Sequence, residues 1–332
     1  MCIRDRSKVN RIAVLTSGGD APGMNAAVRA VVRTAAFNNI TCFAIYKGYQ
    51  GLIDGDFEEM NARSVNNIVN KGGTILKSAR CLEFRTIEGR EKALKSVQKY
   101  KIDGLIVIGG DGTFTGGMVF QKEHNVPVIG IPGTIDNDIS GTTSTIGYDT
   151  ALNTVIGAID KIRDTAISHN RLFFVEVMGR DAGHIALNAG IGAGAEEILI
   201  PEEDMGLDRL LESLKRSEKT GKQSSIVVIA EGDKTGKNVF EIASYVEQNM
   251  PYYEVRVSVL GHMQRGGTPS CYDRVLASRM GVHAVESIID GKTNMMVGIM
   301  HEKMTLYPLQ DAIKGKSKIS KDLIRVSDIL TI

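Results

Sequence analysis

The stretch "VIGGDGTFTG", residues 107–116, runs from the end of an apolar segment into closely spaced glycines around one carboxylate, Asp111. The segment before it, "GLIVIGG" (104–110), is apolar and β-branched without alternation, as in a parallel strand covered on both faces. In sheets of this kind, ligands bind beside the carboxyl ends of the strands. The glycines would let a large anion lie against the backbone, and Asp111 would supply a hard oxygen. An Asx turn at Asp111 is the alternative.

The same apolar pattern recurs along the chain, and longer amphipathic segments separate its occurrences. Further strands are expected at 11–16, 41–46, 126–133, 172–179, 225–232 and 255–261. Helices are expected at 25–37, 89–100, 150–166 and 207–219. This alternation predicts an α/β protein with doubly wound, mostly parallel sheets. Because 332 residues correspond to about two domains, we expect two Rossmann-like domains with the active site in the cleft between them.

The composition argues against several kinds of partner. With 40 basic and 39 acidic residues, the chain has no general attraction to nucleic acid or to an anionic membrane. Its four cysteines lack the CxxC spacing of zinc sites, which leaves free thiols in a reducing compartment as the default. No apolar run approaches the roughly 18 residues of a membrane span, and the polar first residues lack the apolar core of a secretory signal. We therefore expect a cytoplasmic protein.

A second acidic loop, "GIPGTIDNDISG" (130–141), follows the next expected strand. It places Asp136 and Asp138 two residues apart, with Thr134 just before them. In phosphoryl transfer, the acceptor hydroxyl needs a carboxylate to take its proton, and the transferred group needs donors on its oxygens. Two acids in a loop are often only surface groups. Beside the Asp111 loop at the same edge of a sheet, they favour catalysis.

A glycine-rich loop, "TSGGDAPG" (16–23), precedes the expected helix at 25–37. Backbone N–H groups exposed by Gly18 and Gly19 beside a helix N-terminus suit a phosphate. The chain has no GxxxxGK[ST] P-loop, and "GIGAGA" (190–195) lacks the glycine spacing and the preceding strand of a dinucleotide site. The sequence therefore indicates phosphate binding without a P-loop or a bound dinucleotide.

Basic residues complete this candidate site. Those at the ends of expected strands, or in the loops beside them, are Arg171, Arg180, Arg256, His262 and Arg265. Such a cluster in a nearly neutral protein favours a phosphorylated substrate, because a guanidinium binds phosphate through two parallel hydrogen bonds. For any single arginine, a surface salt bridge is the alternative. The histidine would equally suit a turn without a ligand.

Seven motifs make the chain resemble the bacterial ATP-dependent 6-phosphofructokinases from about residue 9 to its end. They are "LTSGGDAPGMNAA", "GGTILKSAR", "IGGDGT", "PGTIDNDI", "HNR", "VEVMGRDAG" and "GHMQRGGTPSCYDR". The motif "GGDGT" alone is weak, since NAD kinases and lipid kinases resemble it, but the combination in this order is highly specific. The resemblance implies transfer of the γ-phosphoryl group of Mg-ATP to the 1-hydroxyl of fructose 6-phosphate. The products would be fructose 1,6-bisphosphate and ADP, in glycolysis.

The resemblance also implies roles for individual residues. Asp136 would be the general base, with Asp138 beside it, and Asp111 would bind magnesium. Thr134 and Arg180 would stabilise the transferred group. The ATP site would consist of Gly19, Arg80, Cys81, Gly110, Asp111, Gly112 and Thr113. The fructose 6-phosphate site would consist of Thr134, Asp136, Arg171, Met178, Gly179, Arg180, Glu231, Arg256, His262 and Arg265. A separate ADP or phosphoenolpyruvate effector site would use Arg29, Arg33, Arg163, Glu196 and Lys222.

Domain limits and assembly follow from the same resemblance. The larger, ATP-binding domain would comprise residues 8–145 and 264–312, and the smaller, fructose 6-phosphate-binding domain residues 146–263 and 313–332. Arg171 and Arg256 match positions that reach into the site from a neighbouring subunit. The resemblance therefore implies a homotetramer with shared active sites.

Two glycines bear on the phosphoryl donor. The related pyrophosphate-dependent enzymes carry Asp at the position of Gly112 and Lys at that of Gly133. A carboxylate at position 112 would crowd and repel the α-phosphate of ATP, so both glycines favour ATP. A catalytically silent metabolite sensor is the remaining alternative. It would be expected to lack Asp111 or Asp136, and both are present.

Overall fold

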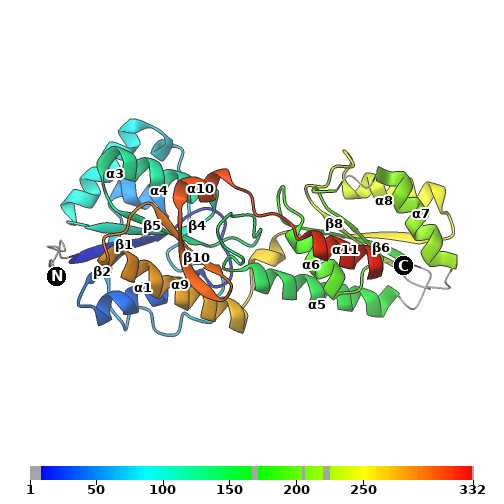
Figure 1. Cartoon of the computed structure of the whole chain (residues 1–332), viewed down its shortest axis with the longest axis horizontal. Coiled ribbons are helices and arrows are strands. Elements are labelled where there is room, and N and C mark those ends of the chain that lie inside the picture. Colours follow the sequence, from blue (N-terminus) through cyan, green and yellow to red (C-terminus); the bar gives the residue numbers. More distant parts are fainter. Residues whose placement is uncertain (1–8, 167–170, 204–205, 220–224, 331–332) are drawn as a thin grey trace. The chain divides into compact units, whose positions relative to one another are not determined.

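The computed structural model describes residues 9–166, 171–203, 206–219 and 225–330. The chain forms two compact units, traced in Figure 1. Unit 1 consists of the chain up to Ile135, Ile139–Asp149 and Arg265–Ser317. Unit 2 consists of Asp136–Asp138, Thr150–Gln264 and the chain from Lys318 onward. Each unit has its own sheet and its own hydrophobic core.

Unit 1 is built on a seven-stranded sheet in the order β11-β10-β5-β4-β1-β2-β3. Its strands are β1 (Arg11–Thr16), β2 (Thr41–Ile45), β3 (Phe57–Met60), β4 (Gly104–Gly109), β5 (Val128–Pro132), β10 (Met295–Met300) and β11 (Lys303–Pro308). Neighbours from β10 to β2 pair in parallel, and the edge strands β3 and β11 pair antiparallel. The central strand β4 is buried along its whole length, as its unbroken apolar sequence predicts.

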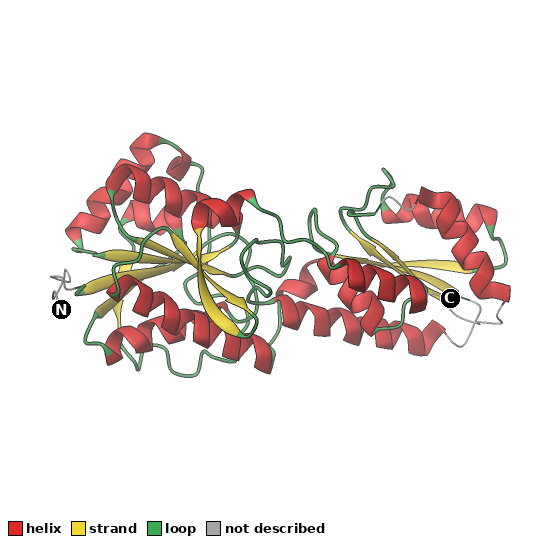
Figure 2. Ribbon diagram, in the orientation of Figure 1, coloured by secondary structure: helices red, strands yellow, loops and turns green. Residues whose placement is uncertain are grey.

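Helices cover both faces of the unit 1 sheet (Figure 2). On one face, α1 (Met24–Phe37) packs against α9 (Cys271–Ile289). The other face carries α2 (Tyr49–Asp54), the short 3₁₀ helix η1 (Glu83–Arg85), α3 (Ile87–Lys99), α4 (Asp111–His124) and α10 (Leu309–Lys314). The core on this second face joins Leu15 and Val107 of the sheet to Phe114 and Phe120 of α4. Burial of these apolar side chains fixes α4 against the sheet.

Unit 2 has a four-stranded parallel sheet in the order β7-β8-β6-β9. Its strands are β6 (Arg171–Val177), β7 (Glu197–Leu199), β8 (Ser225–Ala230) and β9 (Glu254–Val259). One face carries α5 (Tyr148–Ala166), α6 (His184–Gly192) and α11 (Lys321–Leu330), and the other α7 (Gly206–Lys219) and α8 (Val239–Asn249) (Figure 1). The 3₁₀ helix η2 (Gly261–Arg265) follows β9.

The α/β architecture expected from the alternating pattern is confirmed. All seven expected strands and all four expected helices are present, with ends that differ by at most two residues. Residues 190–192 of the segment 190–195 end helix α6, so no strand leads directly into its glycines. Within the described ranges, no helix combines the length and the apolarity that crossing a bilayer requires.

The main difference concerns the stretch after β4, which the sequence indicates to be a loop. Asp111 is instead the first residue of α4, so the glycine-rich segment forms the first turns of a helix. Glycine disfavours a helix by about 1 kcal/mol per residue, which hides α4 from a sequence pattern. Gly116 and Gly117 are there because Tyr49 packs against them: a Cβ at Gly116 would lie 2.9 Å from Cε2 of Tyr49.

Candidate active site

The carboxyl ends of β1, β4 and β5 are level with one another in unit 1. Thr16 pairs with Ile108, and Gly109 pairs with Pro132. Beyond the strands, the N–H of Ser17 donates to the carbonyl of Ile108 at 3.0 Å. The N–H of Gly133 donates to the carbonyl of Gly109 at 3.0 Å. The three loops expected to hold phosphate groups and catalytic acids therefore start side by side.

The first turn of α4 offers a place for an anion. Gly110 is the N-cap residue, Asp111 is partly exposed, and Gly112 is exposed. A Cβ at Gly109 would meet the carbonyl oxygen of Ser17 at 2.4 Å, whereas a Cβ at Gly112 would meet nothing within 4 Å. Packing inside the protein therefore requires a glycine at 109 but not at 112. The first turn of a helix has backbone N–H groups without partners in the helix, and these attract negative charge.

The loop after β1 approaches the segment after η2. Gly23 has a φ of 107° and is the N-cap residue of α1. A Cβ at Gly19 would lie 2.7 Å from Nη1 of Arg265. The structure thus brings together Gly19 and Arg265, which the resemblance assigns to different ligands. Any side chain at Gly19 would displace this guanidinium.

Asn25, which no sequence argument singled out, holds a third loop beside this one. Its side chain is 1% exposed. Nδ2 donates to the carbonyls of Lys71 and Gly72 at 3.0 and 3.1 Å, and Oδ1 accepts from the N–H of Ile75 at 2.7 Å. A Cβ at Gly72 would meet the carbonyl oxygen of Gly267 at 2.2 Å. The motifs "GGTIL" and "QRGG" therefore lie directly against each other in unit 1.

The loop after β5 is buried where its candidate catalytic residues lie. Thr134 and Asp136 are 8% and 3% exposed, and Asp138 is partly exposed. Oγ1 of Thr145 donates to the carbonyl of Thr134 at 2.6 Å. A Cβ at Gly110 would lie 3.9 Å from that of Thr134, so the threonine is beside the first turn of α4.

Asp273, at the start of α9, is a second residue that the sequence analysis missed. It is fully buried, and Oδ1 accepts from the N–H of Gly147 at 2.9 Å. Ser270 is the N-cap residue of α9, and its hydroxyl donates to Oδ2 of Asp149 at 2.5 Å. These bonds fasten the start of α5 and the residue before it to the start of α9. No sequence pattern indicates them, because the partners are more than 120 residues apart.

In unit 2, the loops after β6 and β8 are joined through one carboxylate. Oε1 of Glu231 accepts from the N–H groups of Arg180 at 2.7 Å and Gly179 at 3.3 Å. Oε1 of buried Gln264 accepts from the N–H of Met178 at 3.2 Å. Arg180 has a φ of 54°, an uncommon conformation that these bonds support. The structure thus brings Met178, Gly179, Arg180 and Glu231 together, and η2, with His262, is held to them through Gln264.

Arg171 and Arg256 do not belong to this group, which corrects the expectation of a single cluster of basic residues. Arg171 is the first residue of β6, and six residues at about 3.3 Å each separate it from the carboxyl end of the strand. Its Nε donates to Oε2 of Glu254 at 2.9 Å, and Nη2 of Arg256 donates to Oε1 of the same carboxylate. An arginine can stand at either end of a strand, so its residue type does not show at which end it lies. The chain direction places Arg171 at the amino end of β6.

The expected effector residues are divided between the units. Arg29 and Arg33 lie on α1 in unit 1, and Lys222 lies outside the described residues. In unit 2, Nη2 of Arg163 donates to the carbonyls of Ala193 and Gly194 at 2.7 and 2.8 Å. Its Nη1 is 3.9 Å from Oε1 of Glu196. Arg163 of α5 therefore lies beside Glu196, in the loop between α6 and β7.

The thiols and acids of the described residues do not form a preassembled metal centre. No group of three or more His, Cys, Asp or Glu side chains is arranged for a metal ion within that part of the chain. Cys42, Cys81 and Cys271 are free thiols. Burial raises the pKa of Cys42 to about 12 and, to a smaller extent, the pKa of Cys81. Both thiols therefore remain protonated near neutral pH.

Glu176, on β6, is an acid whose titration the structure perturbs. Burial first, and then the negative charges of Glu231 and Asp233, raise the pKa of Glu176 above its usual range. Because this pKa is raised in the folded state, the associated stability is fully present below the pKa of the unfolded chain. It is lost as the pH rises through the folded pKa.

Glu176→Gln is therefore expected to raise the apparent melting temperature relative to the unmodified protein at pH 7, by about 1–3 °C, and to have no such effect at pH 4. Scanning calorimetry at both pH values measures the two differences. Glu59→Gln, at an exposed position of β3, is the control. An equal gain at pH 4 and pH 7 would show that the carboxylate is not destabilised by its surroundings.

Together, the parallel sheets and the glycine-rich helix and loop starts at their carboxyl ends define an α/β protein of a class suited to phosphorylated ligands. Comparison with known proteins makes this class specific. Residues 11–288 match the family model described as phosphofructokinase. The chain belongs to the phosphofructokinase family.

Relatives at about half identity cover nearly the whole chain. It is 52% identical to "ATP-dependent 6-phosphofructokinase 2" of Bacteroides thetaiotaomicron, over 98% of this chain and 99% of the relative. It is 51% identical to "ATP-dependent 6-phosphofructokinase" of Bacillus subtilis, over 98% of this chain and 100% of the relative.

Solved structures agree on the fold. The phosphofructokinase of Saccharomyces cerevisiae superimposes with a TM-score of 0.88 at 37% identity, over 92% of this chain. This chain spans 45% of the length of that yeast chain. A pyrophosphate-dependent phosphofructokinase from Nitrosospira multiformis superimposes with a TM-score of 0.85 at 20% identity, over 97% of this chain and 92% of that one. The second likeness concerns the fold alone.

Proposed function

We propose that this protein transfers the γ-phosphoryl group of ATP to the 1-hydroxyl of fructose 6-phosphate. The observation that carries the proposal is near-complete coverage, at about half identity, by relatives named ATP-dependent 6-phosphofructokinases. Gly112 supports the choice of ATP. Since no packing inside the protein requires a glycine there, the open space in front of it is available to a nucleotide phosphate.

We assign the chemistry to the buried loop after β5. Asp136 takes the proton of the attacking hydroxyl, and Thr134 donates to the transferred group from its place beside Gly110. Arg180 adds a positive charge for the developing anion, on a backbone that Glu231 holds. Met178, Glu231, His262 and Arg265 bind the sugar phosphate, and Gly19, Arg80, Cys81 and Thr113 line the nucleotide site.

Magnesium fits the donor set at the start of α4. Asp111 is partly exposed there, and magnesium on nucleotide phosphates takes only one or two protein carboxylates. Bound in this way, the ion would neutralise phosphate charge during transfer. The single carboxylate is consistent with an ion that arrives together with the nucleotide.

We further propose that unit 1 binds the nucleotide and that unit 2 supplies most sugar-phosphate contacts. Arg171 and Arg256 would serve the site of a neighbouring subunit in a homotetramer. Their position toward the amino end of the unit 2 sheet supports this assignment. Arg171 is about 20 Å along β6 from the loop that follows this strand, and Arg256 pairs with Phe173 in the first half of β6. An ADP or phosphoenolpyruvate site that uses Arg29, Arg33, Arg163, Glu196 and Lys222 remains a proposal.

The deciding experiment measures ADP release with fructose 6-phosphate and Mg-ATP, beside a parallel assay with pyrophosphate as donor. We expect turnover with ATP only. Preference for pyrophosphate would overturn the argument from Gly112. Binding of both substrates without turnover, in a folded protein, would favour a metabolite sensor instead.

A further inference from the structure

A tyrosine hydroxyl enters the hydrogen-bonding pattern of α4 near its start. Tyr49 of α2 donates to the carbonyl of Thr113 at 2.5 Å. Thr113 is in the first turn of α4, so this bond fastens that turn to α2. Burial raises the pKa of Tyr49 well above its usual range, so the hydroxyl stays a donor.

The tyrosine ring is fixed on both sides. On the α4 side, a Cβ at Gly117 would lie 3.3 Å from the Tyr49 hydroxyl, so the glycine admits it. On the other side, the ring stacks on Phe84 of η1, with centroids 4.1 Å apart and planes 16° from parallel. Both rings are buried, at 6% and 4% exposure. The start of α4 is thereby tied to η1, which directly follows Arg80 and Cys81.

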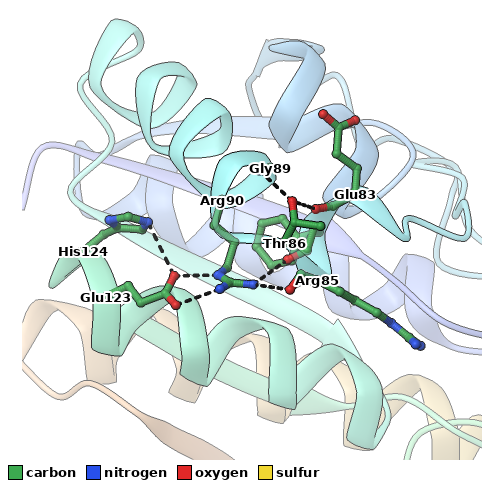
Figure 3. A network of polar contacts seen from close by, with 8 residues as sticks. Glu83, Arg85, Thr86, Gly89, Arg90, Glu123 and His124 are labelled. Carbon is green, nitrogen blue, oxygen red and sulfur yellow. Dashed lines mark hydrogen bonds and ion pairs between the residues drawn. The ribbon is translucent and has the colours of Figure 1, made fainter.

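Arg90, which forms an ion pair with Glu123 of α4, also holds η1 (Figure 3). Nη1 of Arg90 donates to the carbonyls of Phe84 and Arg85 at 3.0 and 2.8 Å. Nε and Nη2 donate to the two oxygens of Glu123 at 2.5 and 2.7 Å. This hydrogen-bonded pairing with Arg90 lowers the pKa of Glu123. Arg90 is 7% exposed. Two nitrogens of its guanidinium thus bind one carboxylate through a pair of hydrogen bonds, and the third binds η1.

Glu123 lies near the end of α4, the same helix whose start holds the Tyr49 hydroxyl. The contacts therefore form a continuous chain. It runs from the first turn of α4 through Tyr49, Phe84 and Arg90 to Glu123 in the last turn of the same helix. We propose that these residues and Glu123, which we call the α4 brace, are positioning residues for the nucleotide. They keep the turn with Asp111 and Gly112 in register with the segment that carries Arg80 and Cys81. This inference rests on the proposed function of unit 1.

Tyr49→Phe tests the brace, because it removes the donating hydroxyl and keeps the stacked ring. Without the hydroxyl, the first turn of α4 loses its hydrogen bond to α2. Loss of a buried hydrogen bond corresponds to about tenfold in an equilibrium constant. We expect the dissociation constant of Mg·ADP, measured by calorimetry on the full chain, to rise about tenfold, and KM for ATP with it. KM for fructose 6-phosphate should stay within about twofold.

Tyr46→Phe is the matched control. It also removes a phenol hydroxyl from unit 1, one that donates to Glu58 at 2.7 Å away from α4. It should leave the binding of Mg·ADP unchanged. Glu123→Gln tests the other end of the brace independently and can replace Tyr49→Phe if that variant fails to fold. It should weaken the binding of Mg·ADP about threefold.

The outcomes separate the two proposals. If Tyr49→Phe and Glu123→Gln melt at lower temperature but bind Mg·ADP as tightly as the unmodified protein, the residues are merely structural and the brace is overturned. An equal rise in both Michaelis constants overturns it too. If the unmodified protein binds no Mg·ADP and consumes no ATP, the proposed function fails, and the brace fails with it.

Discussion

Asp136→Asn is expected to lower kcat by about 10³-fold or more, with little change in the binding of either substrate. Asparagine has the shape of aspartate and suits a site that is 3% exposed, but it cannot accept the proton of the attacking hydroxyl. General-base catalysis contributes about 10²–10⁴-fold, and a base that also orients the hydroxyl belongs at the upper end. A coupled assay of ADP release gives kcat, and calorimetry with Mg·ADP gives the nucleotide affinity.

Asp138→Asn separates the roles of the two acids in the same loop. Asp138 is partly exposed, so its loss should cost much less than the loss of buried Asp136. Asp103→Asn, on an exposed turn whose carboxylate accepts from the N–H groups of Asn10 and Arg11, controls for the removal of a carboxylate elsewhere in the chain. If Asp136→Asn kept more than a tenth of the original kcat, another group would have to be the base.

The fold could be predicted wherever local sequence and tertiary environment agree. The strand β4 is apolar throughout because it is buried on both faces, so its sequence identifies it. The strand β3, "FEEM", is four residues long and charged, because an edge strand faces solvent, and it gave no such signal. Helix α4 was hidden because its glycines are poor helix formers. Two of them, Gly116 and Gly117, are present because Tyr49 packs against them.

The candidate site, like the fold, could be predicted only in part from the sequence. That the Asp111 and Thr134 loops start side by side follows from the rule that parallel strands end at one edge, and the pairing of Gly109 with Pro132 agrees. Asn25 and Asp273 could not be found, because their significance consists of contacts with loops about 50 and 126 residues away. A single sequence does not record such contacts. The misplacement of Arg171 had a simpler cause. Arg171 directly precedes the strand expected at 172–179, so the chain direction already placed it at the amino end of that strand.

Gly112→Asp is expected to raise KM for ATP about 100-fold or more without destabilising the protein. A Cβ at this position meets nothing within 4 Å, and a carboxylate in the first turn of α4 interacts favourably with the helix dipole. Folding should therefore tolerate the change. A bound nucleotide should not, because two like charges about 4 Å apart repel by about 4 kcal/mol near a protein surface. A factor of 100 corresponds to about 2.7 kcal/mol of that repulsion.

Gly112→Asn is the matched variant, because it has nearly the same volume and no charge. If repulsion dominates, Asn should raise KM for ATP about tenfold and Asp at least ten times more, with equal melting temperatures. If the two variants are equally impaired, crowding and not charge excludes the nucleotide. An Asp variant that keeps the original KM for ATP would place the phosphates elsewhere. The exposed glycine would then have no part in choosing the donor, and the assignment of the first turn of α4 to the nucleotide would have to be abandoned.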